Sequence, residues 1–225
     1  MTSSGSDDAV DRLRAAMVAA GRRLGARGLI AAGEGNLSVR LPGRRLLVTP
    51  TGLRKDELEP GDLVIVEADG AVDSAAGAPR RPTSDLAIHL AIHAARPDVL
   101  AVAHAHLPSA MALTLAGERA DPAALPETAL FLPRLPFVPF GQPGSEELAR
   151  RVAATLAEPP EPPAGATLLE RHGAVAVGSG PGGGDDPSAA AAALGQAIDR
   201  LELVEVLCRA TRDAILIRAA RSRPA

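Results

Sequence analysis

Aromatic side chains are nearly absent from this chain of 225 residues. It contains no tryptophan, no tyrosine and only three phenylalanines, all between Phe131 and Phe140. Proteins that bind single-stranded nucleic acid stack the bases on aromatic side chains, so a platform of that kind is excluded. The absence of tyrosine also means that no phenol group is available as a catalytic acid or base.

Cysteine and lysine each occur once. The single cysteine, Cys208, excludes an internal disulfide and an all-cysteine zinc site, and its helical pattern indicates a small core residue. The single lysine, Lys55, lies in the polar run of residues 54–57, whereas a Schiff-base lysine needs a desolvated pocket in which to lose its proton. Imine chemistry at Lys55 is therefore not expected.

The sequence has neither a strong charge excess nor a long apolar run. The formal net charge is −3 and the arginines are scattered, so no basic surface for a nucleic-acid backbone is expected. No stretch approaches the roughly 20 apolar residues of a membrane span, and residues 1–8 lack the apolar stretch of a signal peptide. We therefore expect a cytoplasmic protein that binds neither nucleic acid nor membranes.

Length and periodicity predict a single domain over residues 1–225. Apolar residues at helical spacing predict helices at residues 13–28, 84–96, 145–156 and 187–218, with a shorter one starting near residue 108. Short β-rich runs between turn residues predict strands at residues 36–41, 45–49, 62–67, 99–106, 167–170 and 174–177. The order of these elements indicates an α/β fold in which helices cover a mixed, largely antiparallel sheet.

Two of the five histidines lie two residues apart at the end of an expected strand. Side chains at positions i and i+2 of a strand point the same way, with Cα atoms about 6.6 Å apart, so His104 and His106 can reach one metal ion. The alternative is a pair of ordinary polar residues, but the apolar strand before them would then bury two polar rings together. His172 follows another apolar strand, just before Gly173, and is the candidate third ligand.

Two further patterns have the spacing of known kinds of site. His89 and His93 share one face of an expected helix, but they lack the intervening glutamate of the zinc-protease pattern, so we interpret them as structural. Residues 178–183 have the glycine spacing of a dinucleotide-binding loop. Pro181 interrupts that loop, and the long helix after it leaves no sequence for the second parallel strand, so a surface loop is the better interpretation.

Three polar clusters, at residues 33–36, 49–52 and 82–85, place hydroxyl or amide groups beside glycine or proline. Together they offer backbone N–H groups and uncharged side chains at the starts of elements, which is a nest able to hold a phosphate without a lysine. Asp85 is expected in the first turn of its helix, where the dipole favours a carboxylate. Glu34 and Glu127 are the next candidates for a general base.

In chain order, five motifs resemble the class II aldolase/adducin family. They are GNLSVR at residues 35–40, TPTG at 49–52, PTSD at 82–85, AHAH at 103–106 and RHG at 171–173. The resemblance extends from about Leu13 to the last helix and implies a mixed sheet between helical layers. It also implies a homotetramer with active sites at subunit interfaces, and one zinc ion per chain bound by His104, His106 and His172.

The resemblance also implies roles for the polar clusters. Asp85 stands where most family aldolases have a catalytic glutamate, and the phosphate-binding positions are Asn36, Thr51, Gly52, Thr83 and Ser84. The implied reaction is zinc-assisted retro-aldol cleavage of a ketose phosphate to dihydroxyacetone phosphate, or a related enediolate, and an aldehyde. The alternatives are pentulose-phosphate epimerisation, sugar dehydration or decarboxylation on the same zinc site, and a non-catalytic adducin-like assembly domain.

Three features depart from the family pattern. Gly33 replaces a phosphate-binding threonine of the fuculose-phosphate branch, which weakens the expectation of a phosphorylated substrate. Asp85 is one methylene shorter than the aldolase glutamate and resembles the ribulose-5-phosphate 4-epimerase branch instead. Both branches use tyrosines to protonate the product, and because this chain has none, another group or water has to do so.

Overall fold

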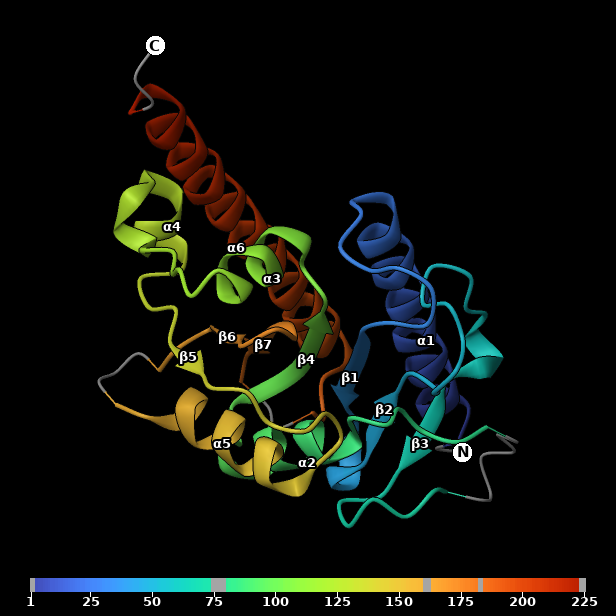
Figure 1. Cartoon of the computed structure of the whole chain (residues 1–225). Helices are drawn as coiled ribbons and strands as arrows, with labels where there is room; N and C mark the ends of the chain where they lie inside the picture. Colours follow the sequence, from blue (N-terminus) through green and yellow to red (C-terminus); the bar gives the residue numbers. More distant parts are fainter. Residues whose placement is uncertain (1–2, 74–79, 160–162, 182–183, 223–225) are drawn as a thin grey trace.

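The computed structural model describes residues 3–73, 80–159, 163–181 and 184–222 (Figure 1). Its α-helices are α1 (Ser3–Ala26), α2 (Leu86–Ala95), α3 (Pro108–Leu115), α4 (Pro126–Phe131), α5 (Glu146–Ala157) and α6 (Pro187–Arg221). Its strands are β1 (Asn36–Arg40), β2 (Leu46–Val48), β3 (Val64–Val66), β4 (Val99–Ala105), β5 (Phe137–Val138), β6 (Ala166–Leu169) and β7 (Gly173–Ser179). Short 3₁₀ turns occur at Pro42–Arg44, Pro60–Asp62 and Pro122–Ala124.

The strands form a seven-stranded sheet in the order β3-β2-β1-β4-β7-β6-β5. Every neighbouring pair is antiparallel except β5 and β6, which run parallel. Strands β4 and β7 are the longest and lie at the centre, with β1 beside β4. The expected mixed, largely antiparallel sheet is confirmed.

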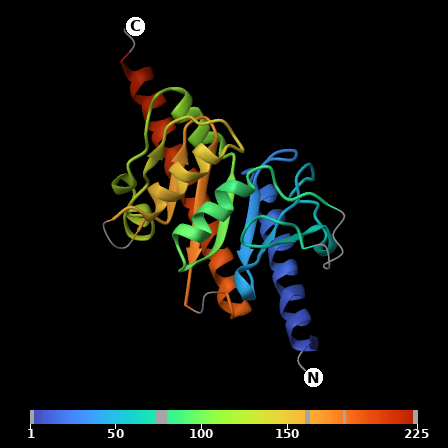
Figure 2. The same ribbon diagram turned by 90° about the horizontal axis from the view of Figure 1, so that it is seen from below.

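Helices cover both faces of this sheet. Helices α1, α3 and α6 share one large apolar core with the sheet, whereas α2 and α5 pack together on the opposite face (Figure 2). Helix α6 packs very closely on β7. At the contact, a Cβ atom added to Gly178 would lie 1.8 Å from the carbonyl oxygen of Ala193, so only glycine fits there. The strands carry small side chains on the face toward this helix, namely the alanines at positions 101, 103, 174 and 176, which allow the helix to approach the sheet closely. Cys208, on α6, is fully buried, as its helical pattern predicted.

Two helix starts follow the predicted capping signals. The Ser145 side chain accepts a hydrogen bond from Leu148 N at 3.2 Å, and Asp186 accepts one from Ser188 N at 2.8 Å. Pro187 then occupies the first turn of α6, where a missing N–H costs nothing. Local side-chain chemistry therefore sets these boundaries.

The proline-rich part of the middle of the chain was expected to be irregular, but it contains α4 and β5. Helix α4 has six residues and β5 has two, so neither is long enough to leave a periodic pattern in the sequence. Of the loop at 178–183, residues 182 and 183 lie outside the described residues. None of the helices in the described part of the chain has the length and hydropathy needed to span a bilayer.

Candidate functional site

The three polar clusters of the sequence meet at one end of β1. A β-bridge joins Pro50 to Pro82, and on either side of it Thr51 N donates to Arg81 O at 3.1 Å and Thr83 N donates to Thr49 O at 3.0 Å. Thr49 N in turn donates to Leu37 O at 3.0 Å, which ties both segments to β1. Backbone pairing thus brings together segments that lie up to about 50 residues apart.

These segments enclose a cavity of about 410 Å³. Its wall carries hydroxyl, amide, carboxylate, ammonium and imidazole side chains from Glu34, Asn36, Thr51, Lys55, Thr83, Ser84, Asp85, His106 and His172. Two of the predicted site residues are not on this wall. His104 is fully buried behind it, and Gly52, with φ +77°, turns the chain after Thr51.

Three histidines converge at the inner end of the cavity. His104 lies near the end of β4, His106 follows that strand, and His172 lies in the turn between β6 and β7. Their ring centroids are 4.7 to 5.0 Å apart, and one ligand atom from each lies within 4.8 Å of the others. Gly173 makes this approach possible, because its φ is +84° and a Cβ there would lie 2.1 Å from Ala105 O.

The protonation of these rings suits a metal ion. His104 Nδ1 donates to Ala174 O at 3.0 Å, which fixes the tautomer and leaves the Nε2 lone pair bare. His104 Nε2 and His172 Nδ1 are buried and have no hydrogen-bond partner in the described part of the chain. Burial and the neighbouring imidazoles lower the pKa of His104 to about 3, and the same causes lower the pKa of His172. Neutral rings with unpaired buried nitrogens fit a divalent ion that prefers nitrogen ligands, such as Zn²⁺.

A carboxylate accompanies the outermost histidine. Glu34 Oε1 lies 3.3 Å from His106 Nδ1, and Glu34 Oε2 accepts a hydrogen bond from Ala31 N at 3.1 Å. A carboxylate in this place orients an imidazole whose other nitrogen is free. The sequence indicated Glu34 only as an alternative general base. Its position between two glycines, two residues before Asn36, was the feature that could have indicated a place in the site. The other reserve, Glu127, is exposed on α4 and is not on the cavity wall.

Asp85 is held as a carboxylate by donors to both oxygens. Asn36 Nδ2 donates to Oδ2 at 2.9 Å and Gly144 N donates to Oδ1 at 3.1 Å. Burial alone raises the pKa of Asp85, but attraction to His104 and His172, which acts when these rings take up a proton in acid, and the Asn36 bond outweigh it, so the pKa lies below its usual value. The expected position within the first helical turn is wrong, since α2 begins at Leu86 and Asp85 is the N-cap residue, with no capping bond from its side chain.

A buried chain of polar groups lies behind Asn36. His89 Nε2 donates to Asn36 Oδ1 at 2.7 Å, so His89 Nδ1 is free to accept from Ser38 Oγ, also at 2.7 Å. His93 Nε2 lies 3.0 Å from the same hydroxyl. Burial lowers the pKa of His89 to about 4, which keeps the ring neutral. His89 and His93 lie outside the three-histidine cluster and brace Asn36 from behind, in keeping with the structural interpretation.

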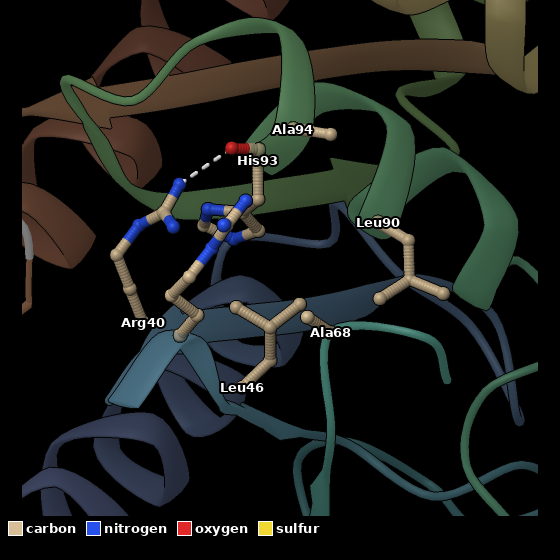
Figure 3. Close-up of a pocket in the computed structure, with 7 residues that line it drawn as sticks. Arg40, Leu46, Ala68, Leu90, His93 and Ala94 are labelled. Carbon is tan, nitrogen blue, oxygen red and sulfur yellow. Dashed lines mark hydrogen bonds between the residues drawn. The ribbon is translucent and has the colours of Figure 1, made fainter. Parts of the chain in front are cut away.

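The far end of this chain reaches a second, much smaller cavity of about 50 Å³ (Figure 3). His93, Leu46 and Leu90 line it, together with Arg40, whose guanidinium donates to His93 O at 2.7 Å and to Val99 O at 3.1 Å. Arg40 therefore holds the C-terminal turn of α2 against β4. The volume is about that of one or two water molecules, so this cavity does not compete with the larger one as a substrate site.

Lys55 differs most from its expected setting. It is only 2% exposed, and its Nζ donates to Gly33 O at 2.7 Å and to Leu53 O at 2.6 Å. Lys55 also lines the large cavity, so the polar clusters, which were expected to form an uncharged wall, share that wall with an ammonium group. The burial of Lys55 could not be predicted from its polar neighbours, because Arg54 is partly exposed and pairs with Asp56 and Glu57.

Comparison with known proteins identifies relatives over most of the chain. The model of the family described as Class II Aldolase and Adducin N-terminal domain matches residues 15–211. The crystal structure of L-fuculose-1-phosphate aldolase from Thermus thermophilus superimposes with a TM-score of 0.77 at 30% identity, covering 95% of this chain and 98% of that one.

Two curated relatives have other activities in their names. A 3-oxo-tetronate 4-phosphate decarboxylase from Haemophilus influenzae is 32% identical over 168 residues, which is 72% of this chain and 75% of that protein. A 5-methylthioribulose-1-phosphate/5-deoxyribulose-1-phosphate aldolase from Rhodospirillum rubrum is 40% identical over 105 residues, so this chain matches less than half of that relative (45%). The family match and the shared fold confirm the resemblance inferred from the five motifs, and the chain belongs to the class II aldolase and adducin family.

Proposed function

We propose that this protein is a zinc-dependent aldehyde-lyase that cleaves a ketose phosphate by a retro-aldol reaction. The products are dihydroxyacetone phosphate, or a related enediolate, and an aldehyde. One observation carries the proposal: three histidines, two of them with unpartnered buried nitrogens, converge beside a carboxylate that accepts hydrogen bonds on both oxygens at the wall of the same cavity. His104, His106 and His172 would hold one Zn²⁺ per chain, and this ion would supply Lewis-acid chemistry to a ketose.

Asp85 acts as the general base in this reaction. It takes the proton from the substrate hydroxyl on the far side of the bond to be cleaved, the O–H electrons form the aldehyde carbonyl, and the C–C electrons pass to the ketose carbonyl as an enediolate. Asn36 and Gly144 keep Asp85 ionised and fix its direction, so proton transfer needs no reorientation of the carboxylate. A proton returned to the enediolate completes the product.

The polar end of the cavity binds the substrate phosphate. Thr51, Thr83 and Ser84 present hydroxyls on its wall and Asn36 presents an amide, while Gly52 turns the chain just after Thr51. Thr83 Oγ1 accepts from Asp85 N at 3.2 Å, so its own hydrogen is free to donate outward. Hydroxyl and amide donors of this kind recognise phosphate oxygens.

The test is a substrate screen of the zinc-loaded protein. The panel contains ketose 1-phosphates, pentulose 5-phosphates and unphosphorylated ketoses, and products are identified by NMR. We expect an aldehyde and dihydroxyacetone phosphate, or its analogue, from at least one ketose phosphate. Turnover in which every C–C bond survives would reject the lyase assignment.

A second candidate is a related reaction on the same site. Asp85, rather than a glutamate, is shared with the epimerase branch, and relatives of this chain are named decarboxylase or dehydratase. Epimerisation yields a pentulose with one inverted carbon, dehydration releases water and decarboxylation releases CO₂. The same product analysis therefore separates all four reactions. A non-catalytic assembly role predicts a bound metal with no C–H exchange on any sugar.

The protein also presents apolar surface suited to self-association, and a homotetramer is part of the proposal. Leu130, Phe131, Leu216 and Ile217 are between 53% and 71% exposed. They lie on α4 and on the end of α6 that extends away from the sheet (Figure 1). In a homotetramer, we expect these side chains to be covered by a neighbouring subunit. Light scattering after size exclusion measures the expected fourfold mass.

A further inference from the structure

The ammonium group of Lys55 lies between the two loops that form the polar end of the large cavity. One N–H bond goes to Gly33 O, on the loop before β1, and another goes to Leu53 O, just after the Thr51–Gly52 turn. An ammonium has three N–H bonds, and no third acceptor for Nζ occurs among the described residues. Lys55 is the only lysine of the chain and lines the cavity together with Asn36 and Thr51.

This buried charge has no counter-ion within the described residues. No aspartate or glutamate there pairs with Lys55, in contrast to Arg54, which pairs with two carboxylates at 2.7 and 2.8 Å. The two carboxylates on the same cavity wall have other partners: Glu34 is directed to Ala31 N and His106, and Asp85 accepts from Asn36 and Gly144. Burial lowers the pKa of Lys55, because removing the charged ammonium group from water is unfavourable. A buried charge is stable only when it is paired or well hydrogen-bonded, so an anion in the cavity would relieve this cost.

We propose that Lys55 is a specificity-determining residue whose third N–H and positive charge recognise the phosphate group of the substrate. This inference rests on the proposed function only for the identity of the sugar, because binding of inorganic phosphate to the cavity is measurable without turnover. A charge at Lys55 offers the anion a contact in place of the threonine hydroxyl that the family pattern has at the position of Gly33. A charge from a residue twenty-two positions later in the chain takes over part of that role.

Phosphate is favoured over a carboxylate ligand by the surroundings of Lys55. Three hydroxyls and one amide, from Thr51, Thr83, Ser84 and Asn36, share the cavity with the ammonium group. A phosphate monoester has three terminal oxygens that accept several donors at once, whereas a carboxylate has two. The donor set therefore matches the larger anion.

The first experiment uses the zinc-loaded wild-type protein. Because there is one lysine, protein grown with lysine labelled with ¹⁵N at Nζ gives a single side-chain ammonium signal. We expect inorganic phosphate to shift this signal along a saturable curve, while sodium acetate and sodium chloride at the same ionic strength leave it in place. Phosphate binding without any change in the Lys55 signal contradicts the proposal, as does the absence of phosphate binding. A saturable shift with acetate equal to that with phosphate contradicts the choice of ligand.

The second experiment compares variants by calorimetric titration with inorganic phosphate. Lys55→Gln keeps a donor for the carbonyls and removes the charge, so the Kd for phosphate rises about tenfold or more. Arg54→Gln is the matched control, since it removes an adjacent but exposed charge and leaves the Kd unchanged. Equal phosphate affinity in wild type and in folded Lys55→Gln overturns the inference, and the NMR titration of the wild type decides the matter if that variant does not fold.

The outcomes also separate this inference from the proposed reaction. Phosphate binding that depends on Lys55, in a protein that turns over no sugar, supports the anion site and rejects the lyase. Cleavage of a ketose phosphate with kcat/KM unchanged in Lys55→Gln supports the lyase and rejects the role of Lys55. A purely positioning role predicts a third pattern, in which Lys55→Gln weakens phosphorylated and unphosphorylated ketoses by the same factor, and that result also rejects the charge-recognition role.

Discussion

Asn36 donates its amide N–H to Asp85 at 2.9 Å and receives a hydrogen bond from His89 at 2.7 Å on its carbonyl side. The amide therefore has a defined orientation, and its direction is set by the charge on Asp85. The Asn36 side chain thus connects the candidate general base to a buried histidine pair, His89 and His93, that does not line the large cavity. Substitution of Asn36 is therefore expected to affect Asp85 as well.

Replacing Asp85 by asparagine should leave the metal in place and reduce kcat by at least ~100-fold, the lower range of general acid–base contributions. The amide is similar in size and cannot exchange a proton at neutral pH. Metal content and kcat of Asp85→Asn are the measurements, with Asp85→Glu as the control that keeps the carboxylate and loses less. An active Asp85→Asn protein would move the base to Glu34, which lines the same cavity.

Removing a phosphate donor should weaken phosphorylated substrates selectively. Thr51→Val is cleaner than Asn36→Ala, because Asn36 also holds Asp85. A hydrogen bond to a charged group contributes about 1.5–3 kcal/mol, so kcat/KM for a phosphorylated ketose should fall about tenfold or more. The value for its unphosphorylated parent should be unchanged. Equal values for both sugars in the wild type, unaltered in Thr51→Val, would indicate a neutral substrate.

The reverse change at Gly33 should tighten phosphate binding. A Cβ atom added there meets nothing closer than Leu53 O at 3.9 Å, and the backbone is not in the left-handed region. Gly33→Thr therefore introduces a hydroxyl at the edge of the cavity without a clash, and the Kd for inorganic phosphate should decrease. Unchanged affinity in a folded variant would place Gly33 too far from the anion to matter.

Stability should depend on the buried histidine pair and on pH. Ser38→Ala removes the partner of His89 Nδ1 and His93 Nε2, which should lower the free energy of unfolding by about 1–3 kcal/mol. The exposed Ser188→Ala is the control and should be nearly neutral. In metal-free protein, the pKa of about 4 for His89 means that the unfolded chain binds the extra proton between about pH 6.5 and 4.

Acidification through that window should therefore destabilise the metal-free protein, with a limiting slope of roughly 1.4 kcal/mol per pH unit for each such histidine. Urea unfolding at several pH values measures it, and His89→Gln should flatten the slope. Stability that rises as the pH falls from 6.5 to 4 would mean that the buried rings are charged in the folded protein.

The sequence predicted those features that local chemistry determines. Ser145 and Asp186 cap their helices as expected, because a side-chain oxygen and the adjacent backbone N–H decide each start. The strand-end histidines follow from period-two geometry, which places His104 and His106 on the same side. The strand end before Gly173 indicated His172 as the third ligand, and the family motifs added the role of Asp85, whose partners lie far away in sequence.

Features that depend on tertiary contacts were not predictable. The ammonium group of Lys55 is bonded to carbonyl oxygens of Gly33 and Leu53, and the polar residues next to Lys55 in the sequence do not indicate these acceptors. The two-residue strand β5 is defined by its pairing with β6. Glu34 lies beside His106, which is 72 positions later in the chain, so their contact depends on the fold. Asp85 is the N-cap residue rather than part of the first helical turn, and its side chain is bonded to Asn36 and Gly144, which are both distant in sequence.

Metal analysis of purified protein tests the central claim most directly. Wild-type protein should contain one divalent ion per chain, held by His104, His106 and His172. His104→Ala and His172→Ala should each lose it, whereas His89→Ala, a buried histidine outside the cluster, should keep it. Full metal content in folded His104→Ala and His172→Ala would contradict the account, and loss confined to His89→Ala would show that the site lies elsewhere.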